Sequence, residues 1–159
     1  MLGFRRKVTI QSFWQPRLEG MFSGKNEPGW DALRASFNDA ILNGVNSKLF
    51  YSHMQAMTIE IVSIAITKTS PPDTGIASRL FVSDFLESNH HQDVALLASK
   101  YNSAFGSSFT DGVRPMVDFF SKDVASSLLA AETVDGFYGT LYGLLRQMCD
   151  MFKQIKFVS

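Results

Sequence analysis

Apolar residues recur every three or four positions along most of the chain, which is the spacing of one face of an α-helix. The pattern is most regular near the C-terminus, where it holds for three heptads and predicts one helix over residues 134–157. Tyr138, Leu145 and Phe152 widen this stripe beyond a two-helix seam, which favours a central helix inside a bundle. The heptad positions are Val134, Phe137, Leu141, Leu144, Met148, Met151 and Ile155.

The same spacing predicts further helices between polar or Pro- and Gly-containing segments. Between Ile10 and Phe22 we expect a bent or broken amphipathic helix, because Pro16 interrupts its middle. The β-branched residues within 58–67 make a strand the rival there, but they show no clean alternation, so a helix is favoured. The other helices are expected at 30–42, 48–69 and 71–88, from Asn89 to Phe105, and from 110 or 111 to 124. The predicted fold class is therefore all-α, a single-domain bundle of six or seven helices around a long C-terminal helix.

Residues at the helix ends give more detailed expectations. Ser70 is expected to cap a helix that begins at Pro71, and Asn89 to cap the next one in the manner of a capping box. Gly136, Gly139 and Gly143 would each cost about 1 kcal/mol against alanine inside a helix. Three such residues favour the close approach of another helix, and the alternative is a helix start that frays up to Leu141.

Composition limits the class of protein. The chain has 159 residues, a formal net charge of zero and 45% apolar residues, which is typical of one soluble globular domain and argues against disorder. It lacks the basic excess of a general nucleic-acid binder. Its single cysteine, Cys149, excludes an internal disulfide and a cysteine-based zinc site.

Nothing in the sequence indicates secretion or membrane insertion. The stretch Val8–Ser12 is too polar and too short for the apolar region of a signal peptide, although the basic residues before Glu19 leave a transit peptide as the weaker alternative. No run reaches the roughly 18 apolar residues of a spanning helix. We therefore expect a cytoplasmic protein without stable membrane insertion.

Charge divides the chain in two. Residues 1–29 carry a net charge of +3, and the rest carries −3. We expect 1–29 to form a basic, aromatic N-terminal segment that docks on a helical bundle domain, 30–159. The predicted partner-binding residues of this segment are Phe13, Trp14, Arg17 and Leu18. One alternative is that Phe13, Trp14 and Leu18 pack on the bundle. Another is that the basic residues contact an anionic membrane surface or nucleic-acid phosphates, although four basic residues make only a weak patch.

Three positions are candidates for chemistry. His53 lies on an apolar stripe beside Met54 and Met57, which suits either a haem ligand or a buried histidine that is hydrogen-bonded to a neighbour. Glu87 and His90 have the Glu-x-x-His spacing of di-iron bundles, but no second pair exists, so no metal site is predicted. Cys149 is expected to pack as a small apolar side chain.

The sequence contains no P-loop, no glycine-rich dinucleotide motif and no Gly-x-Ser-x-Gly motif, so no catalytic residue, cofactor or metal is predicted. Fourteen Phe, four Tyr and two Trp supply more aromatic surface than such a bundle hides, which indicates an interface. The predicted function is a non-enzymatic, intracellular protein–protein interaction module that binds another protein or itself as a homodimer. The alternative is a ligand- or haem-binding bundle with a pocket near His53.

Overall fold

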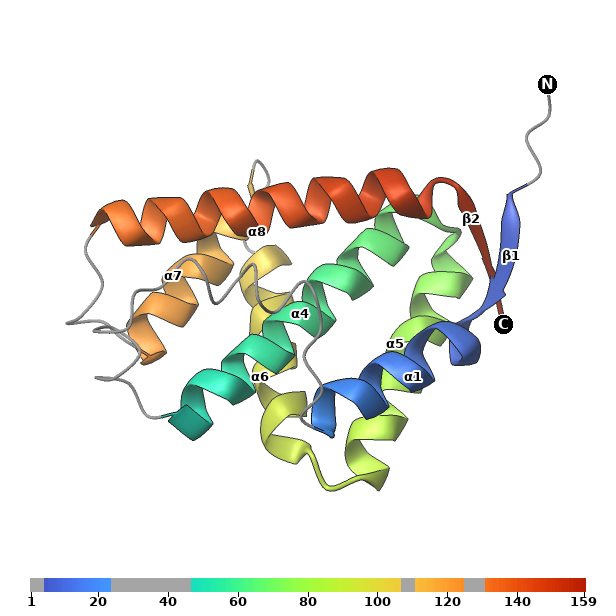
Figure 1. Ribbon diagram of the computed structural model, residues 1–159, viewed down its shortest axis with the longest axis horizontal. Coiled ribbons are helices and arrows are strands. Elements are labelled where there is room, and N and C mark those ends of the chain that lie inside the picture. The colour runs from blue at the N-terminus through green and yellow to red at the C-terminus, as the bar shows by residue number, and fades with distance from the viewer. Residues whose placement is uncertain (1–4, 24–46, 107–110, 125–130) are drawn as a thin grey trace.

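The computed structural model describes residues 5–23, 47–106, 111–124 and 131–159, and it confirms the all-α prediction (Figure 1). A bundle of helices is accompanied by one pair of short strands. The helix predicted at 30–42 lies outside the described residues. The elements are β1 (Arg6–Thr9), α1 (Ile10–Phe22), α4 (Ser47–Thr69), α5 (Pro72–Ser88), α6 (Gln92–Gly106), α7 (Val113–Val124), α8 (Ala131–Phe152) and β2 (Ile155–Val158).

The most enclosed helix is α4, which packs against α5, α6, α7 and α8. From Ser52 to Ile66, Gln55 and Thr58 alone are partly exposed, so this helix is buried on all sides rather than along one stripe. A helix that is buried on all sides has apolar residues on every face, so its sequence shows no single apolar stripe. For that reason a strand was the alternative prediction for this segment. By length and hydropathy α4 could also cross a membrane, but 78% of the apolar window is buried inside the protein, as occurs in core helices.

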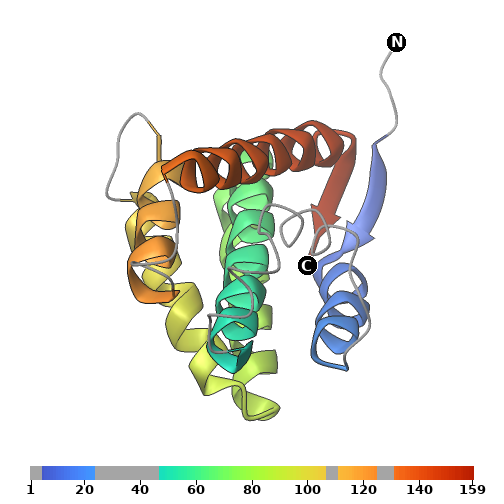
Figure 2. The same ribbon diagram turned by 60° about the vertical axis from the view of Figure 1, so that its left-hand side comes forward.

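Helix α8 is long, as predicted, but it is not the helix around which the others pack. It lies across one end of the other helices, with one face turned to solvent (Figures 1 and 2). Phe137, Leu141 and Leu145 are buried beneath it, whereas Met151 of the predicted stripe is half exposed. The described residues do not supply the close approach predicted at the α8 glycines, because a Cβ atom at Gly136, Gly139 or Gly143 would meet none of their atoms within 4 Å.

The predicted C-terminal helix over 134–157 ends too late. Helix α8 stops at Phe152, and the chain turns through Lys153 and Gln154, whose amides donate to the carbonyl oxygens of Cys149 and Met151. Strand β2 then pairs in parallel with β1, with Arg6 opposite Ile155 and Thr9 opposite Val158. The two ends of the chain are therefore held together.

Several helix ends differ from the sequence expectation by one or a few residues. Helix α5 starts at Pro72 and is preceded by Pro71, not by Ser70, as the capping residue. Asn89 ends α5 instead of starting α6. His90 follows with φ 61°, and the amides of His90 and His91 donate to the carbonyls of Glu87 and Leu86, which is a Schellman motif.

Helix α1 is continuous, which corrects the prediction of a broken helix. Pro16 lies inside it without ending it. The Thr9 side chain caps the first turn by accepting a hydrogen bond from the Ser12 amide at 3.0 Å. Because Thr9 is also the last residue of β1, strand and helix follow each other without a linker, and the orientation of one fixes the other.

Candidate functional site

Three of the four predicted partner-binding residues belong to the core. Trp14 and Leu18 are completely buried and Phe13 is 5% exposed, so these side chains are not available on the surface as predicted. The Trp14 indole N–H donates to the Ser78 hydroxyl of α5 at 2.7 Å. Arg17 is the one exposed member, and its guanidinium covers the Phe13 ring and donates to the Phe13 carbonyl.

Phe13 joins the two ends of the chain. Its ring packs edge-on against Phe152 at the end of α8 and against Phe157 of β2, with centroids 5.4 and 5.2 Å apart. Phe152 and Phe157 also contact each other. This aromatic cluster anchors the small sheet to the helices through α1.

The sheet itself was not predicted from the sequence. In the described part of the chain it has two strands, and β1 is the outer one (Figures 1 and 2). Arg6, Lys7 and Thr9 of β1 are exposed and Val8 is half-buried. The signal that could have revealed the sheet is the alternation in Ile155-Lys156-Phe157-Val158, where Phe157 is buried and Lys156 is exposed.

Basic side chains surround the outer strand. Arg5 precedes β1, Arg6 and Lys7 lie on it, and Lys156 stands opposite Lys7 in the strand register. All four are exposed, and none forms an ion pair with a carboxylate of the described residues. The edge of β1 therefore combines a backbone that pairs with no further strand of the described residues with positive charge that none of their carboxylates pairs.

His53 occupies a polar network in the core rather than a haem pocket. Its ring is completely buried, with Nδ1 2.6 Å from the Tyr101 hydroxyl and Nε2 2.7 Å from the Asp123 carboxylate. Since a carboxylate only accepts, Nε2 donates to Asp123, and Nδ1 of the neutral ring accepts from Tyr101. Both nitrogens have partners, so neither is left to bind a metal or haem iron.

Burial controls the protonation of this network. Desolvation lowers the pKa of His53 and the Lys100 charge adds to the effect, although Asp123 opposes both. Burial also raises the pKa of the Tyr101 hydroxyl well above its ordinary value. The Tyr101 hydroxyl of this network therefore stays protonated and donates to His53.

The two other candidate positions are an exposed helix end and a partly buried thiol. Glu87 and His90 are both exposed, and the described residues contain no cluster of three side chains that could hold a metal ion. Cys149 is partly buried on α8, and desolvation raises the pKa of its thiol, whereas a nucleophilic cysteine needs a lowered pKa.

Comparison with protein-family models, curated proteins and solved structures finds no match for this chain. Function is therefore inferred from the geometry of its own residues. Among the sites described above, the basic edge of β1 is a strand edge that no other strand of the described residues covers.

Proposed function

We propose that this protein is a non-enzymatic interaction module that binds an extended, acidic segment of another protein along the outer edge of β1. The observation that carries the proposal is the isolated parallel pair β1–β2, whose outer strand is exposed and basic. A cytoplasmic location and the lack of catalytic activity are parts of the same proposal. It keeps the predicted class of function but moves the docking surface from Phe13, Trp14 and Leu18 to the strand before them.

The backbone supplies the first argument. An edge strand presents a row of N–H and C=O groups that can pair with another chain. Parallel sheets are usually buried and two-stranded sheets are marginal on their own, so a third strand would stabilise β1–β2. Extended peptides bind other domains by adding a strand in this way.

Charge supplies the second argument and selects the partner. Arg6 and Lys7 on β1, with Arg5 and Lys156 beside them, would repel one another if two copies paired edge to edge. Lysine on an edge strand also opposes indiscriminate pairing. A segment with acidic residues removes this repulsion, and complementary charge speeds its association. The surface therefore favours an acidic partner over a second copy.

The direct test is a binding titration with a fluorescent peptide of alternating Glu and Val. We expect saturable binding that weakens with added salt, because the contact is electrostatic at the surface. The charge-reversal variant Arg6→Glu/Lys7→Glu should bind at least tenfold more weakly, and a peptide of alternating Lys and Val should not bind.

The matched control is Lys100→Glu/Lys122→Glu, which makes the same change in net charge at exposed positions of α6 and α7. Circular dichroism would verify that both variants fold. The proposal fails if the β1 variant binds the acidic peptide as tightly as the native protein, or if the control loses as much affinity as the β1 variant.

A further inference from the structure

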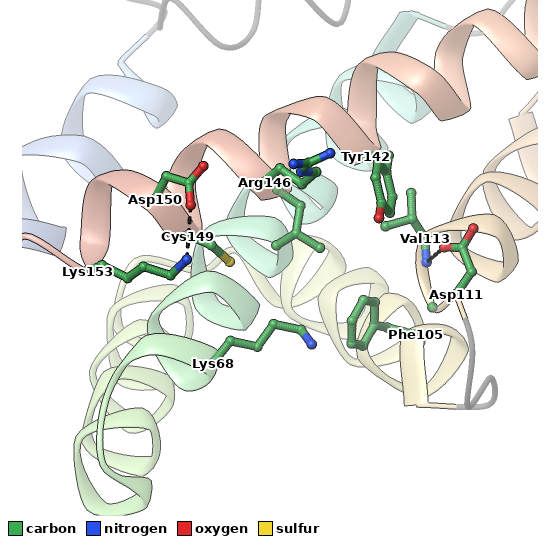
Figure 3. A pocket seen from close by; sticks show the side chains of 11 residues that line it. Lys68, Phe105, Asp111, Val113, Tyr142, Arg146, Cys149, Asp150 and Lys153 are labelled. Carbon is green, nitrogen blue, oxygen red and sulfur yellow. Dashed lines mark hydrogen bonds and ion pairs between the residues drawn. The ribbon is translucent and has the colours of Figure 1, made fainter.

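A pocket of about 370 Å³ opens between α4, α6, α7 and α8, but the charged side chains that line it do not converge (Figure 3). Lys153 donates to Asp150 at 3.0 Å. The Arg146 guanidinium lies over α8 and is turned away from the Lys68 ammonium, as Figure 3 shows. These charges therefore do not surround one position for a ligand.

A second pocket, of about 210 Å³, lies where α4, α5 and α6 pack against one another. Its volume is below the usual range of drug-sized sites, so it suits a ligand of only a few heavy atoms. The charged side chains among its described lining are Glu60 and Arg79, so the lining has no net charge. The uncharged lining residues are Ile59, Ser63, Val82, Ser83, Leu86, Ala95, Ala98, Ser99 and Asn102.

The two charges of this pocket meet at one point. The Arg79 Nη1 atom donates to both oxygens of the Glu60 carboxylate, at 3.1 Å each. The Glu60 side chain on α4 is 5% exposed, and that of Arg79 on α5 is 33% exposed. A carboxylate has about four acceptor positions and a guanidinium has five N–H donors. Because the contact uses a single nitrogen, both groups keep hydrogen-bonding capacity for a ligand.

Burial makes the Glu60 carboxylate a favourable place for a second positive group. Desolvation raises the pKa of Glu60, and the Arg79 charge opposes this shift without cancelling it. A buried charge is stabilised by each further hydrogen bond that it accepts. An ammonium group would supply such bonds, whereas a ligand with negative charge alone would be repelled by Glu60.

Ser63 is an independent indication of a polar ligand. It lies one turn after Glu60 on α4 and is 2% exposed, and its hydroxyl has no hydrogen bond to a described residue. No fully enclosed side-chain oxygen of the described residues lacks a partner, so the Ser63 hydroxyl is not fully enclosed. Because Ser63 lines this pocket, its hydroxyl opens into it, where it can donate to a ligand or accept from one.

We propose that this pocket binds a small α-amino acid as its zwitterion, with the ammonium group on Glu60 and Ser63 and the carboxylate on Arg79. Adjacent charges of opposite sign select a ligand of the same kind, and an α-amino acid carries both charges on one carbon. Charge-assisted hydrogen bonds hold each end. A methyl side chain would pack on Val82 and Ala98, which are buried. The site does not involve β1, so either proposal can fail without the other.

Calorimetric titration with L-alanine tests the site, and we expect saturable binding. Propionate lacks the ammonium group of L-alanine and ethylamine lacks its carboxylate. Each should bind at least tenfold more weakly, because each leaves one charge of the pocket without its partner. L-Tryptophan carries both charges but is too large for the pocket, so it should also bind at least tenfold more weakly.

Two variants test the residues that hold the ammonium group. Ser63→Ala breaks no hydrogen bond to a described residue, so the protein should fold, and its affinity for L-alanine should fall at least threefold. Glu60→Gln should lower this affinity at least tenfold. The control Ser52→Ala changes another buried serine of α4, whose hydroxyl donates to Asp93, and it should bind L-alanine normally. Circular dichroism would verify that each variant folds.

Nuclear magnetic resonance locates the bound ligand, because the methyl groups of Ala95 and Ala98 line the pocket. Their resonances should shift saturably as L-alanine is added. The inference is overturned if L-alanine does not bind saturably, or if propionate, ethylamine or L-tryptophan binds as tightly. It is also overturned if Ser63→Ala or a folded Glu60→Gln variant binds like the native protein, or if the two methyl resonances do not shift.

Discussion

At the scale of single residues, the core of this protein accommodates polar side chains by pairing them across helices. His53, Glu60 and Ser78 are almost completely buried, and each has a partner on another element. In the described part of the chain no buried side-chain nitrogen or oxygen lacks a hydrogen bond. Since an unpaired buried polar group costs about 1–3 kcal/mol, these pairs fix how the helices pack.

The pH dependence of stability should report on His53. Because burial lowers its pKa in the folded protein, the unfolded chain binds a proton at this residue first as the pH falls below about 6.5. Stability should therefore fall between pH 7.5 and 5.5, by at most about 1.4 kcal/mol per pH unit from this group. Urea unfolding of the native protein and of His53→Gln gives the free energy of unfolding of each as a function of pH. The difference between the two free energies should shrink toward low pH.

The control for this measurement is His90→Asn, which removes an exposed histidine and suits the left-handed backbone at that position. This variant keeps His53, so its stability should still fall toward low pH relative to that of His53→Gln. Parallel pH profiles for the native protein and His53→Gln would show that the His53 network does not behave as described.

At the scale of elements, the sequence predicts the helices better than it predicts the two strands and their pairing. The periodicity of Phe137, Leu141 and Leu145 identifies α8 because its buried face is a single stripe. Strand β2 escaped prediction because it has only four residues, and its first residue, Ile155, also continues the heptad spacing of the helix before it. Pairing between β1 and β2 depends on residues about 150 positions apart, which no local pattern encodes.

The glycines of α8 offer a test at this scale. A Cβ atom at Gly136, Gly139 or Gly143 would enter open space among the described residues, so alanine should raise the free energy of unfolding by roughly 0.5–1 kcal/mol at each position. Gly112→Ala is the contrasting variant, because its Cβ would lie 2.5 Å from the Phe105 carbonyl oxygen, and it should destabilise the protein. Thermal unfolding of the four variants measures these effects. If none of the three α8 variants is more stable than the native protein, the open space beside these glycines is contradicted.

At the scale of the whole molecule, the described elements form one bundle in which the first and last elements of the chain, β1 and β2, pair with each other. Helix α4 lies at the centre, α8 crosses one end, and the β1–β2 pair joins the N-terminal and C-terminal segments beside α1 (Figure 2). The sequence could not place the candidate sites within this arrangement. His53, Tyr101 and Asp123 come from three helices, and the pocket at Glu60 and Arg79 is also lined by three.

The aromatic cluster that joins the ends should contribute to global stability. Phe157 is buried between Phe13 and Phe152, so Phe157→Ala should lower the free energy of unfolding by about 3–5 kcal/mol. Lys156→Ala changes an exposed neighbour and should stay within about 0.5 kcal/mol of the native protein. Chemical unfolding compares the two, and equal effects would mean that the sheet is not anchored as described.

The central claim, that the edge of β1 receives an acidic strand, is tested most directly by nuclear magnetic resonance. With the peptide of alternating Glu and Val bound, amide hydrogen exchange within Arg6–Thr9 should slow, and backbone contacts between peptide and β1 should appear. The account is contradicted if the peptide binds and neither slows amide exchange in β1 nor makes backbone contacts with it. It is also contradicted if the contacts of the peptide are confined to the helices.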